Sequence, residues 1–290
     1  MKTTKLILGL AIVLMTFSCN KEENGSPISA NDAKAGAQID AMNDDVSDIV
    51  EEQEINTYTN STSGRTTDLA SSALTTCATI TRVPAFGSAI TPGTEVTKTI
   101  DFGDSCTLNS GNVVSGVITI TFVYQPDATS HTINYSFDNF FHNGIEFNGD
   151  KTFTRTMITT AENPIAHPQV TMTMDLTANI PGLGIYHRVG GRVREIIAGY
   201  GNEILIDNIY KITGSWVTTT PSGAVQNSVI TTPLNVKMSC LSVNKPLLVS
   251  GIITITREST SATLDFGDGT CDNLAVFTVN GNSYNIVIGN

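Results

Sequence analysis

The sequence predicts a mainly β protein, a large antiparallel meander folded as a sandwich or a curved open sheet, with one N-terminal amphipathic helix. Residues 132–137 and 170–177 alternate apolar and polar side chains, as strands do when one face packs on a core and the other meets water. Asn-Gly pairs at 143–144, 148–149 and 280–281 supply the positive φ angles of two-residue hairpins. Only 15% of residues are charged, which favours short strands and turns over long solvated helices. We expect about a dozen strands.

The first 18 residues have the three parts of a secretory signal peptide. Lys2 and Lys5 form a basic start, and an apolar run follows over residues 6–17. That run is too short to span a bilayer, which takes about 20 residues. Ser18-Cys19 resembles the lipobox of bacterial lipoproteins, whose cysteine is acylated and becomes the first residue of the mature chain. Cleavage before Cys19 without acylation, which leaves a free thiol, is the alternative.

Residues 19–28 are predicted to form a polar tether between the lipid anchor and the folded body. The tether begins with Asn20-Lys21-Glu22-Glu23, which resembles the signal that sends lipoproteins of the Bacteroidetes to the outer face of the outer membrane. A solvated polar linker without a sorting role is the alternative. The prediction is therefore a lipid-anchored outer-membrane protein, exposed at the cell surface, with the membrane as its first partner.

Residues 29–74 are predicted to hold a helix over about 30–54, capped by Ser29, and a Ser/Thr/Asn-rich linker over 55–74. The other faces of the helix are acidic, because residues 20–57 hold ten acidic and two basic side chains. We expect its apolar face to pack against the β body, and a partner-binding helix is the alternative. Five apolar residues recur at steps of three and four: Ile39, Met42, Val46, Ile49 and Val50.

The charge balance argues against nucleic acid as a partner. Without Lys2 and Lys5 of the leader, the chain has 14 basic and 27 acidic residues, a net charge of −13. Phosphate backbones repel a body of that charge.

Residues 75–290 are predicted to form a single antiparallel β domain with internal hairpin repeats. The segment 114–121 returns at 249–256, and Asp-Phe-Gly-Asp at 101–104 returns at 265–268. The two elements occur in opposite order in the two halves, which excludes a simple tandem duplication. Related hairpins within one continuous meander account for the pattern.

Once Cys19 is acylated, the four remaining cysteines of an exported chain favour disulfides. Four cysteines allow three connectivities, and each Asp-Phe-Gly-Asp element is flanked by one pair. We therefore expect the pairs Cys77–Cys106 and Cys240–Cys271. Zinc is the rejected alternative, because the chain has no Cys-x-x-Cys and its four histidines are scattered.

Several motifs suggest chemistry without completing it. Asp-Phe-Gly occurs in protein kinases, but the Gly-rich loop and the catalytic His-Arg-Asp are absent. Residues 265–270 resemble the core of the PKD-type β-sandwich repeat of surface proteins, without that family's Pro-x-His-x-Tyr element or closing strand. Asp265, Asp268, Asp272 and Asn273 could offer oxygens to calcium, but they are spaced by three and four rather than two. Carboxylates that cap turns are the preferred interpretation, and no metal site is predicted.

Residues 181–202 hold the basic cluster of this acidic chain, among six glycines. If the stretch is extended, His187, Arg192 and Arg194 could present an anion-binding face; a solvated strand face is the favoured alternative. The nucleophile and zinc motifs of hydrolases are absent, whereas a glycosidase carboxylate pair stays open because its spacing is spatial. No catalytic residue and no cofactor are predicted.

Taken together, the lipobox, the acidic helix, the Thr-rich hairpins, the two Asp-Phe-Gly-Asp…Cys elements and residues 231–234 resemble uncharacterised β-rich outer-membrane lipoproteins of the Bacteroidetes. The resemblance implies no activity. The expected function is a non-enzymatic binding or structural module of the envelope, with a glycan or an envelope protein as partner. A carrier of an apolar ligand, lined by Phe153, Met172 and Met174, is the first alternative. A secreted hydrolase is the second.

Overall fold

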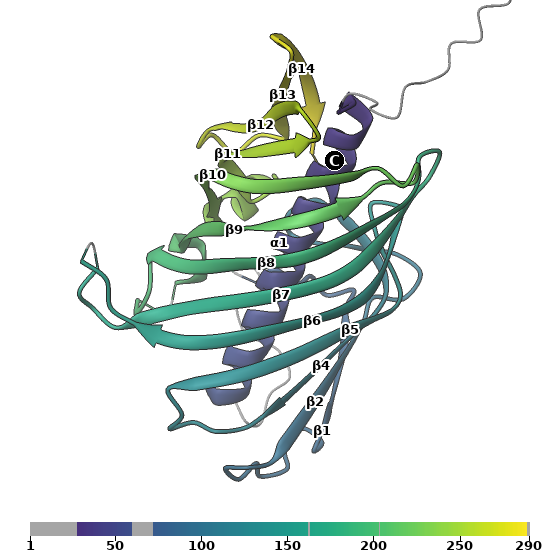
Figure 1. The fold of residues 1–290 in the computed structure, drawn as a ribbon. Coiled ribbons are helices and arrows are strands. Elements are labelled where there is room, and N and C mark those ends of the chain that lie inside the picture. Colours follow the sequence, from purple (N-terminus) through teal and green to yellow (C-terminus); the bar gives the residue numbers. More distant parts are fainter. Residues whose placement is uncertain (1–27, 60–71, 162, 203, 289–290) are drawn as a thin grey trace, which may run out of the picture.

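The computed structural model describes residues 28–59, 72–161, 163–202 and 204–288 (Figure 1). The predicted signal peptide, Cys19 and most of the tether lie outside these residues. One long helix, α1 (Ala30–Thr59), and two short 3₁₀ helices, η2 (Leu205–Asp207) and η3 (Met238–Val243), are present in the described chain. The strands are β1 (Thr79–Val83), β2 (Glu95–Asp101), β3 (Cys106–Thr107), β4 (Val113–Val123), β5 (Ser130–His142), β6 (Ile145–Ile158), β7 (His167–Ile180), β8 (Gly184–Ala198), β9 (Ile209–Thr219), β10 (Val225–Lys237), β11 (Leu248–Arg257), β12 (Thr260–Asp268), β13 (Leu274–Val279) and β14 (Asn282–Val287).

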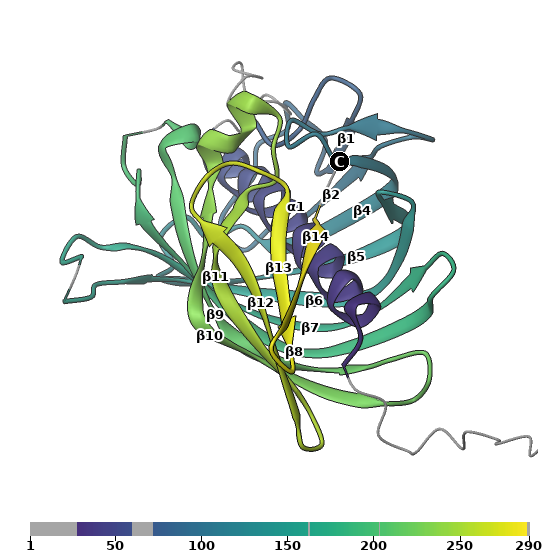
Figure 2. The same cartoon turned by 90° about the horizontal axis from the view of Figure 1, so that it is seen from above.

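The strands of the described chain form a single antiparallel sheet of 14 members, and 55% of the protein is strand. Neighbours in the sheet are neighbours in sequence, except for the short β3, which pairs with β4 beside the main path. The sheet curls around α1 without closing (Figures 1 and 2). The predicted fold class is confirmed, and of its two forms the curved open sheet is the one observed.

Helix α1 begins where the sequence predicts and ends five residues later than residue 54. The Ser29 hydroxyl accepts a hydrogen bond from the backbone N–H of Asp32 at 3.0 Å, and the Asp32 carboxylate accepts one from the N–H of Ser29 at 3.3 Å. This reciprocal cap satisfies two donors that the first turn leaves free. At the other end the extra turn places Tyr58 on Tyr124, with ring centroids 4.9 Å apart.

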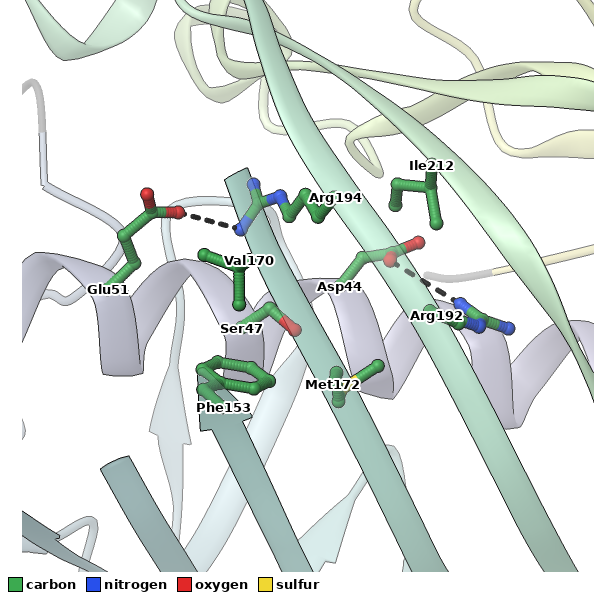
Figure 3. A pocket seen from close by; sticks show the side chains of 9 residues that line it. All are labelled: Asp44, Ser47, Glu51, Phe153, Val170, Met172, Arg192, Arg194 and Ile212. Carbon is green, nitrogen blue, oxygen red and sulfur yellow. Dashed lines mark hydrogen bonds and ion pairs between the residues drawn. The ribbon is translucent and has the colours of Figure 1, made fainter. Parts of the chain in front are cut away.

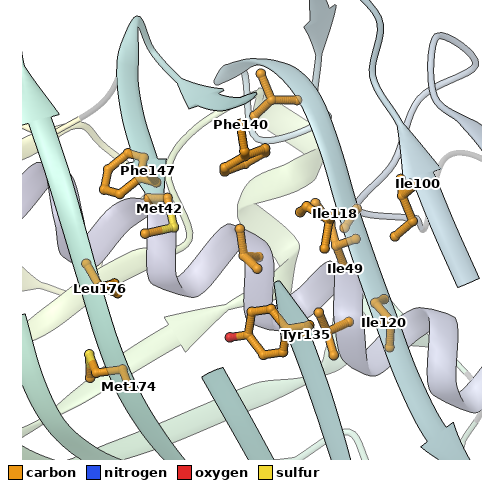
Figure 4. Close-up of a cluster of buried hydrophobic side chains, with 14 of the residues drawn as sticks. Met42, Ile49, Ile100, Ile118, Ile120, Tyr135, Phe140, Phe147, Met174 and Leu176 are labelled. Atoms are coloured by element: carbon orange, nitrogen blue, oxygen red, sulfur yellow. The ribbon is translucent and has the colours of Figure 1, made fainter. Parts of the chain in front are cut away.

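The apolar face of α1 packs into the concave face of the sheet, which confirms the expected packing. Met42 and Ile49 are fully buried against Ile118, Tyr135 and Leu176 (Figure 4). Each such side chain contributes about 1.5–3 kcal/mol by leaving water. The concave side of the sheet is therefore a core and not an open trough.

The predicted alternation along the strands is observed. In β5 Ile133 and Tyr135 are buried while Asn134 between them is exposed, and in β7 Met172 and Met174 are buried on either side of an exposed threonine. The buried residues of these two strands face α1, and the exposed residues between them lie on the convex surface.

Two of the three Asn-Gly pairs form the expected hairpins. Asn143 and Asn280, both with a φ of 50°, turn the chain between β5 and β6 and between β13 and β14. Asn148-Gly149 lies inside β6, so the prediction of a hairpin there is wrong. A Cβ atom on Gly149 would lie 2.2 Å from the carbonyl oxygen of Asp175. The glycine permits a close approach of β6 to β7 rather than a turn.

The repeated sequence elements are neighbouring strands in both halves, which accounts for their reversed order. Strand β2 pairs with β4 and β12 pairs with β11. Asp101 faces Val117 in the first pair, and Asp265 faces Ile252 at the matching position of the second. The same pair of adjacent strands therefore occurs twice, near each side of the sheet. In the first pair the Asp-Phe-Gly-Asp strand precedes its partner in the sequence, and in the second pair it follows its partner.

Both expected disulfides are present. Cys77 is bonded to Cys106 and Cys240 to Cys271, across sequence separations of 29 and 31 residues. Each bridge ties one repeated strand pair to the segment beside it.

Replacing either pair of bonded cysteines with alanine is expected to lower the free energy of unfolding by about 3–4 kcal/mol, because each bridge restricts a loop of about 30 residues in the unfolded chain. Denaturant unfolding of the two double variants, beside the reduced wild-type protein, measures the loss. Non-reducing peptide mapping that links Cys77 to Cys240, or Cys106 to Cys271, contradicts the pairing.

Candidate functional site

Three arginines of β8 point from the concave face of the sheet toward α1. Arg188 donates a hydrogen bond to Asp40 at 2.5 Å, and Arg192 also donates to Asp40. Carboxylates further along the helix also contact these arginines. Arg192 lies 3.7 Å from Asp44, and Arg194 donates a hydrogen bond to Glu51 at 3.2 Å. We call these residues, with Asp48, which pairs with Arg194, the ion cluster.

Aromatic rings of β9 lie under the guanidinium groups of the ion cluster. The Trp216 ring centroid lies 4.8 Å from the guanidinium carbon of Arg188 and 4.4 Å from that of Arg192. Gly190, between the two arginines, makes room for the indole, because a Cβ atom there would lie 2.4 Å from the Cβ of Trp216. Cation–π attraction of this kind, away from water, is worth about 2 kcal/mol.

The acidic faces of α1 are buried, which the helical pattern did not predict. Asp40 is 1% exposed, and Asp44 and Asp48 are each 4% exposed. The physical reason is the curl of the sheet, which surrounds the helix, so that carboxylates that point away from the apolar face still meet strands. Cations on those strands supply the charge that a buried carboxylate needs.

The prediction that His187, Arg192 and Arg194 together present an exposed anion-binding face is wrong. Arg192 and Arg194 are 2% and 7% exposed, and the anions that they bind are carboxylates of the same chain. His187 lies on the convex side of β8, where its ring meets the Asp175 carboxylate at 2.6 Å. The favoured alternative of a solvated strand face is also wrong for the arginines. Even-numbered positions of β8 face inward, so the period-two rule places Arg188 with Arg192 and Arg194 and separates His187 from them.

Other inward polar groups of the sheet bind the helix in the same way. Arg257 donates to Asp32 at 2.9 Å, and the ring of His142 meets Asp45 at 2.9 Å. Lys98 donates to the carbonyl oxygen of Gln53 at 2.5 Å. The sequence predicted none of these three contacts, because single basic residues in separate strands show no pattern until the sheet brings them to one helix.

Burial changes the protonation of several of these groups. Desolvation raises the pKa of Asp44 to about 7, against the attraction of Arg192. Desolvation lowers the pKa of Lys98 to about 8 and that of Lys151, which bonds Asn43, well below its usual value. For Arg194 burial favours loss of the proton, but the carboxylates of Asp48 and Glu51 outweigh it and raise the pKa.

A cavity of about 10 Å³ lies beside the ion cluster (Figure 3). A space of that size holds about one water molecule. Phe153 and Met172, two residues of the predicted carrier site, line it and are 3% and 5% exposed. Together with Met174 they belong to the core against α1, so in this conformation they pack rather than line a space for an apolar ligand.

A larger pocket, about 320 Å³, opens at the C-terminal end of α1. Its volume is in the range of pockets that hold small molecules, about 300–1,000 Å³. The residues around it come from the end of the helix, from the β4–β5 connection and from the adjoining ends of β5 and β6. They are Ile55, Tyr58, Pro126, Ala128, Thr129, His131, Arg155, Thr156 and Met157. We call this space the helix-end pocket.

A network of charged and aromatic groups forms one wall of the helix-end pocket. His131 meets the Glu54 carboxylate through Nδ1 at 2.8 Å and the carbonyl oxygen of Ala128 through Nε2 at 3.2 Å. Arg155 donates to the other oxygen of Glu54 at 3.2 Å. The hydroxyl of Tyr58 lies 3.3 Å from Nδ1 of His131.

The partners of His131 are suited to its charged form. A carboxylate and a carbonyl can only accept, so both ring nitrogens must carry hydrogen to satisfy them. The hydrogen bond to Glu54 accordingly raises the pKa of His131. With both ring nitrogens protonated, His131 and Arg155 give the wall two positive charges against the one negative charge of Glu54.

The carboxylates considered for calcium cap turns, as expected. Asp265 accepts from the backbone N–H of Gly267 at 2.9 Å, and Asp272 accepts from that of Leu274 at 2.9 Å. Asp268 accepts from the N–H and the hydroxyl of Thr270. Across the described residues, no group of three or more His, Cys, Asp or Glu side chains is placed to hold a metal ion.

Comparison of the chain with protein-family models, with curated proteins and with solved structures found no match. Within the part of the chain that the structure describes, no helix has the length and the apolar character to cross a membrane.

Replacing Arg194 with methionine is expected to lower the free energy of unfolding by about 3–5 kcal/mol, because Asp48 and Glu51 are left buried without their cation. Adding Asp48→Asn should recover about 1–3 kcal/mol of that loss, since the two residues act through one contact. Urea unfolding of the single and double variants measures the coupling. His187→Gln on the convex face is the control and should change stability by less than about 0.5 kcal/mol. Strict additivity of the two substitutions contradicts the pairing.

The raised pKa of Asp44 predicts a pH dependence of stability. In the folded protein its carboxyl holds its proton up to pH about 7, whereas the unfolded chain releases it near its usual pKa of 3.8. The contribution of Asp44 is therefore complete below pH 4 and is lost as the pH rises through 7. Subtracting the pH profile of Asp44→Asn from that of the wild type isolates this fall, by up to about 1.4 kcal/mol per pH unit. A flat difference between pH 4 and 7 would show that the carboxylate is ionised in the fold.

Proposed function

We propose that the protein is a lipid-anchored, surface-exposed and non-enzymatic binding or structural module of the bacterial envelope. The observation that carries the proposal is the position of the helix-end pocket relative to the predicted anchor. Residue 28 is joined to the tether, and the pocket begins at Ile55 of the same helix. At about 1.5 Å per residue, α1 places the pocket about 40 Å from the tether, at the far end of the body.

The predicted tether is short enough to hold the body close to the membrane. Eight residues, 20–27, separate Cys19 from Ile28, which is buried at 2% exposure. Even fully extended, they reach about 28 Å. An acylated Cys19 would thus keep the start of α1 near the lipid surface, whereas the pocket lies at the end of the helix far from the tether. This geometry suits a module that meets a partner outside the membrane.

The bonding of the acidic and basic groups favours binding over catalysis. Carboxylates of the ion cluster, the groups that a glycosidase would use, are held by arginines inside the core. His131 has acceptors at both nitrogens, an arrangement that favours a fixed charge over a base. A scaffold with a fixed-charge pocket supports recognition of a partner outside the membrane, in keeping with the resemblance to Bacteroidetes lipoproteins.

The substitution Cys19→Ala is expected to release the protein from the membrane fraction while the β body stays folded, because acyl chains supply the anchor at about 0.8 kcal/mol per buried methylene. Radiolabelled-lipid incorporation with cell fractionation measures the loss. A Cys19→Ala protein that remains in membranes refutes the anchor.

Changing Lys21, Glu22 and Glu23 to alanine tests display: the anchored variant should become resistant to protease added to intact cells, and unchanged cleavage refutes the surface signal.

A further inference from the structure

We propose that the helix-end pocket binds small molecules that carry one carboxylate on an apolar or aromatic body, an inference that rests on the proposed binding function and names its ligand class. The proposal depends on three properties of the pocket: its volume of about 320 Å³, its charge and the chemistry of its remaining walls.

The charge of the pocket favours a single negative charge on the ligand. His131 and Arg155 both line the space, with side chains 15% and 14% exposed. Glu54, which pairs with both, is 1% exposed and lies behind them. Their charges leave an excess of one positive charge at the wall, and a monoanion would neutralise it.

The geometry of the cations favours a carboxylate as that anion. The hydrogen bond from Arg155 to Glu54 uses Nη1 and leaves the other donors of the planar guanidinium, a fork that fits two carboxylate oxygens. The neighbouring hydroxyl of Thr129 and the phenol of Tyr58 line the same space and add hydrogen-bonding groups. Doubly charged phosphate would need more positive charge than this wall supplies.

The other residues around the pocket favour an apolar body. Ile55, Pro126, Ala128 and Met157 present carbon atoms to the pocket, and Met157 is 41% exposed. Tyr58, stacked on the Tyr124 ring, adds an aromatic edge beside the charged groups. Walls that combine a cation pair with aliphatic side chains match an amphiphilic acid better than a sugar with hydroxyl groups on every side.

The test titrates the full chain with phenylacetate, its neutral counterpart phenylacetamide and the sugar acid glucuronate, followed by the methionine methyl NMR signals. We expect phenylacetate to shift the Met157 signal and to bind at least about 10-fold more tightly than phenylacetamide, the difference that one charge-assisted contact makes. Tighter binding of glucuronate than of phenylacetate overturns the apolar part of the inference. Equal binding of acid and amide overturns the carboxylate part.

Matched variants locate the site. Arg155→Met should remove the preference for the acid, whereas Arg155→Lys should keep part of it because the charge remains. Thr129→Trp, at an exposed position of the pocket rim, should abolish binding of both aromatic compounds by filling the space. His187→Gln on the convex face is the control and should bind as the wild type does. Wild-type binding by Thr129→Trp, or a full acid preference in Arg155→Met, overturns the assignment.

The outcomes separate this inference from the proposed function on which it rests. A chain that is anchored and displayed but binds none of the three compounds refutes the ligand class alone. A chain that binds phenylacetate but stays in the soluble fraction refutes the envelope address alone. Circular dichroism of each variant checks that a loss of binding is not a loss of fold.

Discussion

The pairing of α1 carboxylates with cations on the concave face of the sheet is the interaction on which the rest of the structure depends. A helix with this many acids could not enter a protein core alone, because each isolated buried charge would cost several kcal/mol. Arg188, Arg192 and Arg194 offset part of that penalty, and Trp216 gives two of them an aromatic surface. Such pairs add little net stability, but they fix the helix in one register, because sliding by one turn would leave charges unmatched.

The same pairing explains the form of the sheet and of the pocket. A helix with polar partners on several sides needs strands around it, and the open meander supplies them without closing into a barrel. The partners of Glu54, near the end of α1, are more exposed than the arginines of the ion cluster. Glu54 there holds His131 and Arg155 at the margin of the core, where the two cations face space as well as the helix. The pocket is thus the place where the internal ion pairing reaches the surface.

The features that the sequence predicted are those with a local or periodic signal. Alternation identified β5 and β7, Asn143-Gly144 identified a hairpin, and flanking of the repeated element identified the disulfide pairs. Asn148-Gly149 led to the wrong prediction of a hairpin, because an Asn-Gly pair also occurs where two strands approach closely.

What could not be predicted is what lies opposite a given face. A helical pattern tells which side chains of α1 share a side, but not that strands cover its acidic sides. Only the spacing of Arg188, Arg192 and Arg194 on one face of β8 carried a usable signal. The network at the helix-end pocket joins Glu54 to residues 77 and 101 positions away, and no local pattern connects them.

The order in which the ribosome makes the chain adds a consequence of the central helix. Helix α1 is synthesised first, yet Asp32 finds Arg257 225 residues later and Asp40 waits for β8. Contacts so distant in sequence form slowly. Until then Asp32 and Asp40 lack their cationic partners and stay in water. The part of the core that surrounds Asp32 can therefore close only after β11 has emerged, later than the part that α1 forms with β2 to β8.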